Sequence, residues 1–173
     1  MIRLDPGMAF GTGTHPTTRM CLRWIARHGA LRSPRWSSVL DYGCGSGVLA
    51  IAAARFGAGR TVALDIDPAA VETTVANAAA NAVTLKAGPA DSLAEETFDL
   101  VLANILATPL KLLAPLLSRR LAPGGTLVLS GILASQAGEL HAAYAPWLAL
   151  EVADQDDGWI LMTGQRSGSD RVA

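Results

Sequence analysis

The sequence is poor in charged residues, in aromatic residues and in cysteine, and each scarcity excludes a class of protein. Only 17% of the 173 residues are charged and the net charge is −1, so the composition gives no reason to expect a basic surface for nucleic acid. Charge, glycine or proline interrupts every apolar run before it reaches the length of a membrane span. We therefore expect no direct contact with nucleic acid and no membrane insertion.

The two cysteines, Cys21 and Cys44, stand in different predicted elements. This usage is typical of reduced thiols and predicts a cytoplasmic protein, and the N-terminal residues do not resemble a signal peptide. No Cys or His residues are spaced as a ligand pair, so we expect no metal site. Cys44 lies in a glycine-rich loop, where a catalytic thiol is one interpretation and a small residue tolerated by the turn is the favoured one.

What the sequence does contain is hydrophobic residues, which make up half of the chain. A chain of this length can bury a substantial core within one domain. The sequence shows no internal repeat and no linker, so we expect residues 1–173 to form a single domain.

The stretch Val-Leu-Asp-Tyr-Gly-Cys-Gly-Ser-Gly, residues 39–47, predicts a ligand-binding turn. Val39 and Leu40 are typical of a buried strand, and residues 48–56 predict a helix. Gly43 and Gly45 allow the chain to turn tightly and bring its backbone against a ligand. A strand, a glycine-rich turn and a helix in this order are typical of a nucleotide-cofactor site.

The spacing of the glycines argues against a dinucleotide. The dinucleotide fingerprint needs a small residue at the position occupied by Val48. The pattern here is Gly-x-Gly-x-Gly preceded by Asp41, and an acid at that position suits a ligand that carries an ammonium group. A dehydrogenase is accordingly the least favoured enzyme, and a turn without a ligand would not explain the entropic cost of three glycines.

Two further strands end in polar residues. Residues 61–65 predict a second buried strand that ends in Asp65, which lies 22 residues after Gly43 (65 − 43), near the spacing of about 20 expected for an acid that binds a ribose. Asp67 precedes Pro68 at a helix start, and capping explains it. Residues 98–104 predict a strand buried on both faces. It ends in Asn104, which we predict at the ligand-binding edge of the sheet.

The remaining pattern completes an α/β fold. Helices are predicted for 68–80, with Val71 and Val75 facing the sheet, and for 108–121 and 135–145. Further strands are predicted for 83–87, 126–132 (with a bulge at Gly131), 148–154 and 159–164. Trp147 and Trp159 are interpreted as core residues.

Residues 4–18 contain too much glycine and proline for regular structure and predict a mobile loop. A frayed N-terminal arm is the competing interpretation. Phe10 could lie on a base, and the hydroxyl groups in the loop, Thr18 among them, could contact a ligand. His15 is interpreted as a cap or surface residue at the start of a helix that begins near Pro16.

Five stretches, residues 4–18, 41–47, 65–68, 103–107 and 129–133, carry a resemblance to a known family. Through them the sequence is similar, over nearly its whole length, to the catalytic domain of the PrmA family of ribosomal-protein methyltransferases. The glycine pattern alone indicates only a methyltransferase, whereas the first and fourth of the matching stretches are far more specific. These stretches are Leu-Asp-Pro-Gly-Met-Ala-Phe-Gly-Thr-Gly-Thr-His-Pro-Thr-Thr (4–18), Asp-Tyr-Gly-Cys-Gly-Ser-Gly (41–47), Asp-Ile-Asp-Pro (65–68), Ala-Asn-Ile-Leu-Ala (103–107) and Leu-Ser-Gly-Ile-Leu (129–133).

The resemblance implies the Rossmann-like fold of the class I S-adenosylmethionine-dependent methyltransferases, a seven-stranded, mostly parallel sheet with its last strand pair reversed. It implies S-adenosyl-L-methionine as cofactor, contacted by Thr18, Gly43, Asp65 and Asn104, with Phe10 and the threonine loop covering the methionine and substrate side. The substrate it implies is a large-subunit ribosomal protein, methylated on lysine side chains and its N-terminal amine. Asn104 is the expected catalytic residue, because its carbonyl oxygen could accept the hydrogens of a neutral amine.

One departure limits the resemblance. The family carries an N-terminal domain that recognises the ribosomal protein, and this sequence begins at the cofactor loop. We expect either a piece of a longer protein or a naturally short relative, with cofactor binding retained. The alternatives are a methyltransferase for another protein or a small molecule, and a fold that binds cofactor or a partner without transfer.

Overall fold

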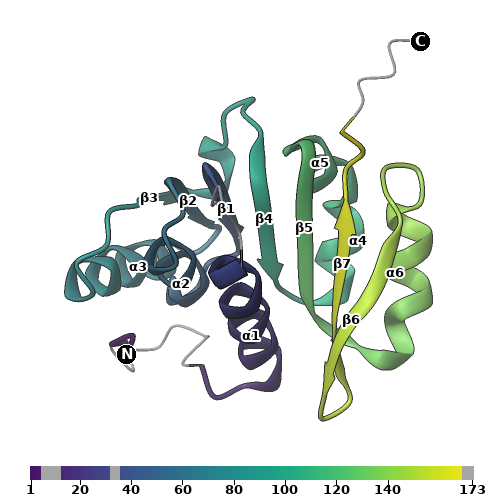
Figure 1. Cartoon of the computed structure of the whole chain (residues 1–173), viewed down its shortest axis with the longest axis horizontal. Coiled ribbons are helices and arrows are strands. Elements are labelled where there is room, and N and C mark those ends of the chain that lie inside the picture. The colour runs from purple at the N-terminus through teal and green to yellow at the C-terminus, as the bar shows by residue number, and fades with distance from the viewer. Residues whose placement is uncertain (5–12, 32–35, 169–173) are drawn as a thin grey trace.

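The computed structural model describes residues 1–4, 13–31 and 36–168, and its centre is one seven-stranded sheet (Figure 1). The strand order is β3-β2-β1-β4-β5-β7-β6. The strands are β1 (Ser38–Tyr42), β2 (Arg60–Asp65), β3 (Lys86–Pro89), β4 (Phe98–Asn104), β5 (Leu121–Leu133), β6 (Leu150–Asp156) and β7 (Trp159–Gln165). The α/β sheet is as predicted, except that the reversal concerns β7 alone, which is antiparallel to both β5 and β6.

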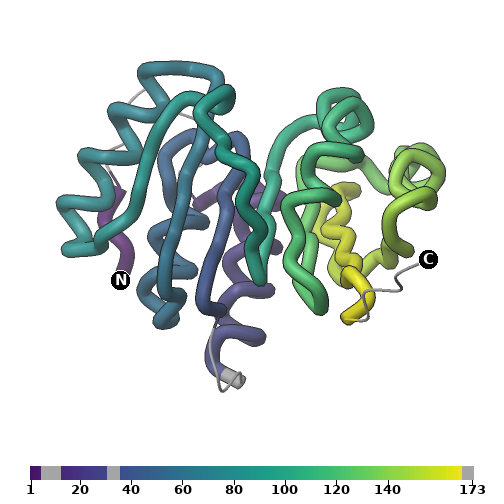
Figure 2. Tube along the Cα trace, turned by 90° about the horizontal axis from the view of Figure 1, so that it is seen from above, coloured from purple at the N-terminus to yellow at the C-terminus, as the bar shows by residue number. Residues whose placement is uncertain are grey.

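Helices cover both faces of the sheet. Figure 2 shows α1 and the helices α4 and α5 on opposite sides of it, while α3 packs beside α2 against β2 and β3. The helices are α1 (Pro16–Leu31), α2 (Val48–Arg55), α3 (Pro68–Ala80), α4 (Ala107–Leu112), α5 (Ala114–Arg119) and α6 (Ala137–Tyr144), with short 3₁₀ turns at Ala90–Ser92 and Ala134–Gln136. Within the described residues no helix is long and apolar enough to cross a membrane.

Side chains that alternate along the strands pack into two main apolar cores, one on each face of the sheet. Leu40 of β1 points to the core under α4, α5 and α6, and its neighbour Val39 points to the core under α1 and α2. Met20 and Ile25 of α1 are fully buried in the second core, so this helix is fastened to the sheet by apolar packing. The central strands are therefore buried on both faces, as parallel strands require.

Helix α3 spans the predicted residues, but the strand after it begins later than predicted. The N–H groups of Ala82 and Val83 donate to the carbonyls of Ala79 and Ala78, and Ala82 has a φ of 50°. This is the hydrogen-bond pattern of a Schellman motif, with alanine in the left-handed position that glycine usually takes. The chain uses residues 82–85 to leave the helix, and β3 starts only at Lys86.

The single helix predicted over 108–121 is two short helices, α4 and α5, joined at Leu113. Pro115 has no backbone N–H, so it cannot donate to the carbonyl of Lys111, and its ring interrupts the helix. Helix α4 also begins at Ala107 rather than at Thr108, after Leu106 as N-cap residue.

The prediction that Trp147 is a core residue is wrong. Its side chain is 40% exposed, and the Arg119 guanidinium lies 5.4 Å from the ring centroid. An indole on the surface can keep its N–H in water while a cation covers its face.

The bulge predicted at Gly131 is confirmed, because the β5–β7 register shifts between Leu129 and Ile132. Gly131 has a φ of 86°, and a Cβ atom there would lie 2.2 Å from the carbonyl oxygen of Ile105. The bulge therefore lets β5 pass directly under the chain that leaves β4, and only glycine fits.

We expect Gly131→Ala to lower the free energy of unfolding by about 2–4 kcal/mol, through left-handed strain and the collision with the backbone of Ile105. Gly124→Ala is the matched control, because Gly124 also has a positive φ but nothing lies within 4 Å of its Cβ position. Its loss should be only about 1–2 kcal/mol. Chemical unfolding that gave equal losses for both variants would contradict this reading of the bulge.

Candidate functional site

A cavity of about 780 Å³ lies at the carboxyl ends of β1, β2 and β4. Because these strands are parallel and adjacent, the polar residues at their ends meet at one edge of the sheet. The cavity brings together all the predicted site residues that the structure describes, namely Thr18, Asp41, Gly43, Gly45, Asp65 and Asn104. Phe10 lies outside the described residues.

The glycine loop, residues 43–47, connects β1 to α2, and its first three residues line the cavity. Gly43, Gly45 and Gly47 all have φ between 53° and 78°, which only glycine adopts readily. The N–H groups of Gly43 and Cys44 donate to the carbonyl of Leu64 on the neighbouring strand β2, at 2.8 and 3.0 Å. The loop thus folds across the end of β2.

Asp65 is tied to this loop. One carboxylate oxygen accepts the N–H of Gly45 at 2.9 Å and the other accepts the N–H of Asp67 at 3.0 Å. Asp67 itself caps α3 by accepting the N–H of Ala69, which confirms the prediction for that residue. Each oxygen of Asp65 keeps a further lone pair, so the carboxylate is oriented by the backbone and can still accept from a ligand hydroxyl.

Asp41 is fully buried at the end of β1. One of its oxygens accepts the N–H of Ala50 at 3.0 Å, whereas the other has no partner among the described residues. Burial raises the pKa of Asp41 to about 7, and the nearby charge of Asp65 adds to the shift. Desolvation penalises the ionised carboxylate, so a cation at this site would stabilise it.

Asn104 faces the cavity from the end of β4. Its side-chain N–H donates to the hydroxyl of Thr18 at 3.3 Å, a contact between residues 86 positions apart. Its carbonyl oxygen is buried and has no partner within the described residues. The hydrogen bond to Thr18 therefore orients the amide and leaves an acceptor available.

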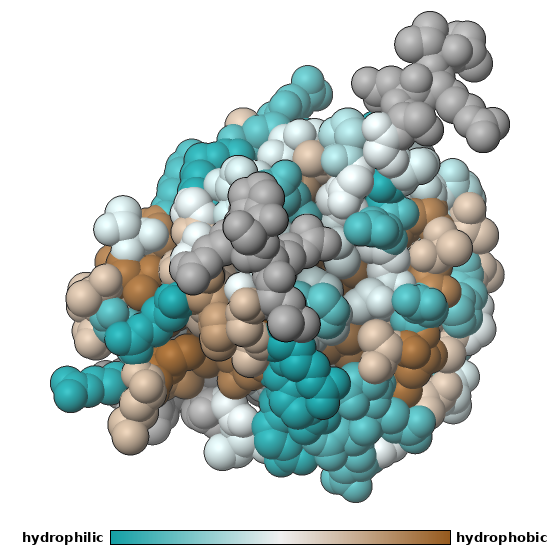
Figure 3. All heavy atoms as spheres, in the orientation of Figure 1, coloured by the Kyte–Doolittle hydropathy of each residue, from teal (hydrophilic) through white to brown (hydrophobic). Residues whose placement is uncertain are grey.

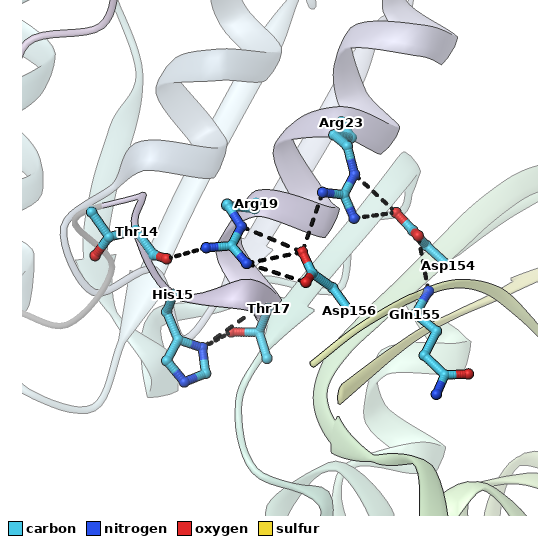
Figure 4. A network of polar contacts seen from close by, with 8 residues as sticks. All are labelled: Thr14, His15, Thr17, Arg19, Arg23, Asp154, Gln155 and Asp156. Atoms are coloured by element: carbon cyan, nitrogen blue, oxygen red, sulfur yellow. Dashed lines mark hydrogen bonds and ion pairs between the residues drawn. The ribbon is translucent and has the colours of Figure 1, made fainter. Parts of the chain in front are cut away.

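The rim of the cavity includes two residues that the sequence did not identify as site residues. The His15 ring contacts the Trp159 ring edge-on, at 5.2 Å between centroids, and both residues line the cavity. The Nδ1 atom of His15 accepts the N–H of Thr17 at 3.4 Å, which confirms the predicted cap (Figure 4). Trp159 is partly buried and packs against the core under α1 and α2, and it also lines the cavity, so its assignment to the core is only part of its role.

An ion-pair network lies beside this rim, between α1 and the β6–β7 hairpin (Figure 4). Arg19 donates to both carboxylate oxygens of Asp156 and to the carbonyl of Thr14. Arg23 pairs with Asp154 at 2.9 Å and with Asp156 at 3.3 Å. Hydrophilic side chains gather over the same region in Figure 3. The network fastens the hairpin to the helix that carries Thr18.

The thiol of Cys44 lines the cavity but is buried. Desolvation by burial raises its pKa to about 12. A neutral thiol is a poor nucleophile, so the structure favours the interpretation of Cys44 as a small structural residue.

One wall of the cavity is apolar and was not predicted. It comes from the chain after β4 and from α4, where Leu106 is 66% and Leu112 is 78% exposed. Ile66, on the opposite side, is 86% exposed. The wall after β4 consists of Ile105, Leu106, Pro109, Leu112 and Leu113. The available sequence signal was the apolar run that follows Asn104, of which residues 108 onward were interpreted as helix.

Comparison with known proteins gives the family. The model of the family Ribosomal protein L11 methyltransferase (PrmA) matches residues 1–167. The chain is 65% identical to the ribosomal protein L11 methyltransferase of Polaromonas sp. over 162 residues, covering 94% of this chain and 54% of the relative. It is 55% identical to that of Bordetella parapertussis over 166 residues, covering 96% of this chain and 53% of the relative.

Solved structures agree on the fold. The ribosomal protein L11 methylase from Lactobacillus delbrueckii subsp. bulgaricus matches with a TM-score of 0.85 and 33% identity, over 96% of this chain and 85% of that chain. The N-methyltransferase NodS from Bradyrhizobium japonicum, in complex with S-adenosyl-L-homocysteine, matches with a TM-score of 0.68 and 20% identity, over 88% of this chain and 89% of that chain. The second similarity concerns the fold alone.

The chain spans about half the length of the curated relatives that it matches. Within that half, the family model covers residues 1–167, and the fold is that of the L11 methylase from Lactobacillus delbrueckii subsp. bulgaricus. The chain therefore belongs to the ribosomal protein L11 methyltransferase (PrmA) family.

Proposed function

We propose that this chain binds S-adenosyl-L-methionine in the cavity and catalyses methyl transfer to amines of a large-subunit ribosomal protein. The observation that carries the proposal is the cavity itself, in which a glycine loop, an acid at the end of β2 and an amide oxygen at the end of β4 converge, the last without a partner among the described residues. Family membership supports the class of reaction, and the geometry of the site supports the role that we propose for each residue.

The described residues fit the cofactor. Asp65, oriented by two backbone N–H groups, can accept the ribose hydroxyls. A Cβ atom on Gly43 would lie 2.5 Å from the side chain of Ile105, so glycine lets the loop pack against the chain that leaves β4. The loop still lines the cavity through Gly43, Cys44 and Gly45, where a ligand can contact its backbone. Asp41 presents a buried oxygen without a described partner, which suits the ammonium group of the methionine moiety. When bound, the cofactor supplies an activated methyl group on a sulfonium.

Asn104 is placed to orient the accepting amine. Its carbonyl oxygen is an uncharged acceptor that can hold an amine N–H and aim the nitrogen lone pair. Because it carries no charge, it does not favour the protonated ammonium form, which cannot attack. We infer that the amine loses its proton to solvent before transfer, and that the apolar wall after β4 lowers the pKa of the amine by desolvation.

The family name supports the proposed substrate. The relatives are named for ribosomal protein L11, and their additional length is where a substrate-recognition domain is expected. Lysine side-chain and N-terminal amines are the proposed acceptors. The single-domain organisation and the cytoplasmic location stay predictions. The competing candidates are a methyltransferase for another protein or a small molecule, and a cofactor-binding fold without transfer.

The direct test is incubation of the chain with methyl-labelled cofactor and ribosomal large subunits from a strain that lacks this enzyme. We expect label in one ribosomal protein, on amines. Calorimetry with S-adenosylhomocysteine separates the alternatives. Binding without any transfer would support the non-catalytic fold, label in other molecules would change the substrate, and failure to bind would refute the proposal.

Asp41 should make cofactor binding depend on pH. Because burial raises its pKa to about 7, the carboxyl is mostly protonated at pH 6 and mostly ionised at pH 8. We expect affinity for the cofactor to rise over this interval as the carboxylate becomes available to the ammonium group. Calorimetry in buffers of different ionisation enthalpy should detect proton release on binding near pH 6.5.

Asp41→Asn is the matched variant for this prediction. It should bind more weakly at pH 8, and the rise in affinity between pH 6 and pH 8 should disappear. Linkage gives a second check, because a carboxyl whose pKa is higher in the folded state lowers stability as pH rises from about 4 to 7. The same pH dependence of affinity in both proteins would remove Asp41 from the site.

Substitutions of Asp65 and of Asn104 should affect binding and catalysis differently. Asp65→Ala should weaken cofactor binding by about 1–3 kcal/mol through lost charge-assisted hydrogen bonds. Asn104→Ala should reduce kcat by more than it reduces cofactor affinity, because it removes the group that orients the amine. Calorimetry and steady-state kinetics on both variants check this contrast. If Asn104→Ala lost affinity and kept kcat, it would be a cofactor ligand only.

A further inference from the structure

Helix α3 buries polar side chains and leaves a valine exposed, which is the opposite of what an ordinary amphipathic helix does. The sequence predicts that Val71 and Val75 face the sheet, yet Val75 is 54% exposed, and Thr74 and Asn77 are 0% and 1% exposed. Burying a polar side chain while leaving a valine in water costs stability unless the polar group is hydrogen-bonded. The partners of Thr74 and Asn77 therefore explain why the helix is turned this way.

Both partners are carbonyl groups of the glycine loop. The Thr74 hydroxyl donates to the carbonyl of Gly45 at 3.1 Å, and the side-chain N–H of Asn77 donates to the carbonyl of Ser46 at 2.9 Å. Residues three apart on a helix lie on one face, so α3 presents two donors to two consecutive peptide groups. A loop rich in glycine has few side chains that could fix its shape by packing.

The thiol of Cys44 completes the contact. Its sulfur lies 3.3 Å from the Thr74 hydroxyl oxygen. A hydroxyl has one proton, and the carbonyl of Gly45 can only accept, so the thiol donates and the hydroxyl accepts. The raised pKa of Cys44, caused mainly by burial, keeps that proton in place. Thr74 thus contacts the loop at two successive residues.

The same contact reaches Asp65. The Gly45 residue gives its carbonyl to Thr74 and its N–H to the Asp65 carboxylate, so it is held from two sides. Gly45 has a φ of 53°, but a glycine can also adopt other backbone conformations at little cost. Without Thr74, the residue keeps the tie to Asp65 but loses the one that opposes it.

We propose that Thr74 and Asn77 are positioning residues that hold the glycine loop, and through Gly45 the Asp65 carboxylate, in the geometry that binds the cofactor. This inference rests on the proposed function. Neither residue lines the cavity, so their effect on the ligand is indirect. The helix buries Thr74 and Asn77 together with two alanines and leaves Val75 exposed, and the two polar side chains organise the backbone of the binding loop before the ligand binds.

The test compares two neighbouring threonines on α3. Thr74→Val keeps the shape of the side chain and removes the hydroxyl, which leaves a loop carbonyl unpaired. Thr73→Val is the control, because the Thr73 hydroxyl donates within the helix to the carbonyl of Ala69. Calorimetry with S-adenosylhomocysteine should give a Kd for Thr74→Val that is roughly 3- to 15-fold above wild type, and Thr73→Val should stay within twofold.

A purely structural role is separated by two further measurements. All titrations are made at a temperature where circular dichroism shows each variant folded, because lost stability alone does not change Kd there. Thr74→Ser, which restores the hydroxyl, should recover most of the affinity. Asn77→Ala provides an independent variant, expected to raise Kd in the same way, in case Thr74→Val does not fold.

The outcomes distinguish the inference from the function on which it rests. If wild type binds and the folded Thr74→Val and Asn77→Ala variants bind within twofold of Thr73→Val, the positioning role is refuted while the proposed function stands. If wild type binds neither S-adenosylhomocysteine nor S-adenosylmethionine, the proposed function fails and the inference fails with it. A selective loss at Thr74 that serine repairs supports both.

Discussion

The architecture depends on how the Gly45 backbone is held between β2 and α3. Its N–H donates to Asp65 at the end of β2 and its carbonyl accepts from Thr74 of α3. These two hydrogen bonds join the glycine loop to β2 and to α3, and they place the loop beside Asp65. A parallel sheet brings the carboxyl ends of its strands to one edge. Backbone hydrogen bonds then decide where each polar atom at that edge points.

The elements that depend on local chemistry could be predicted. The strand–turn–helix around residues 39–56, the cap at Asp67 and the bulge at Gly131 follow from residue types at fixed spacing. The burial of α3 could not be predicted, because a count of apolar positions favours the valines and takes no account of carbonyl groups elsewhere. Pro115, whose missing N–H divides the helix after β4, was a readable signal that the prediction overlooked.

Contacts between residues far apart in the chain could not be predicted from the sequence, for a different reason. That Thr18 meets Asn104, and His15 meets Trp159, depends on where α1 lies on the sheet. The magnitudes show what decides its position. The fully buried side chains of α1 contribute about 1.5–3 kcal/mol each to the free energy of folding. Partly exposed ion pairs such as Arg19–Asp156 contribute only about 0–1 kcal/mol. Apolar packing therefore places the helix, and the arginines adjust its attachment to the hairpin.

Under the proposed function, the distribution of charge in the cavity would separate a cofactor side from an acceptor side. The acids among the described lining residues, Asp41 and Asp65, lie at the ends of β1 and β2, and the wall after β4 carries no charged residue. A cationic cofactor is attracted to the first side. An amine on the second side meets apolar surface and one neutral acceptor, Asn104, so its ammonium form finds no counter-charge. The cavity thereby favours a positive ligand at one end and an uncharged nucleophile at the other, the combination that a reaction between a sulfonium and an amine requires.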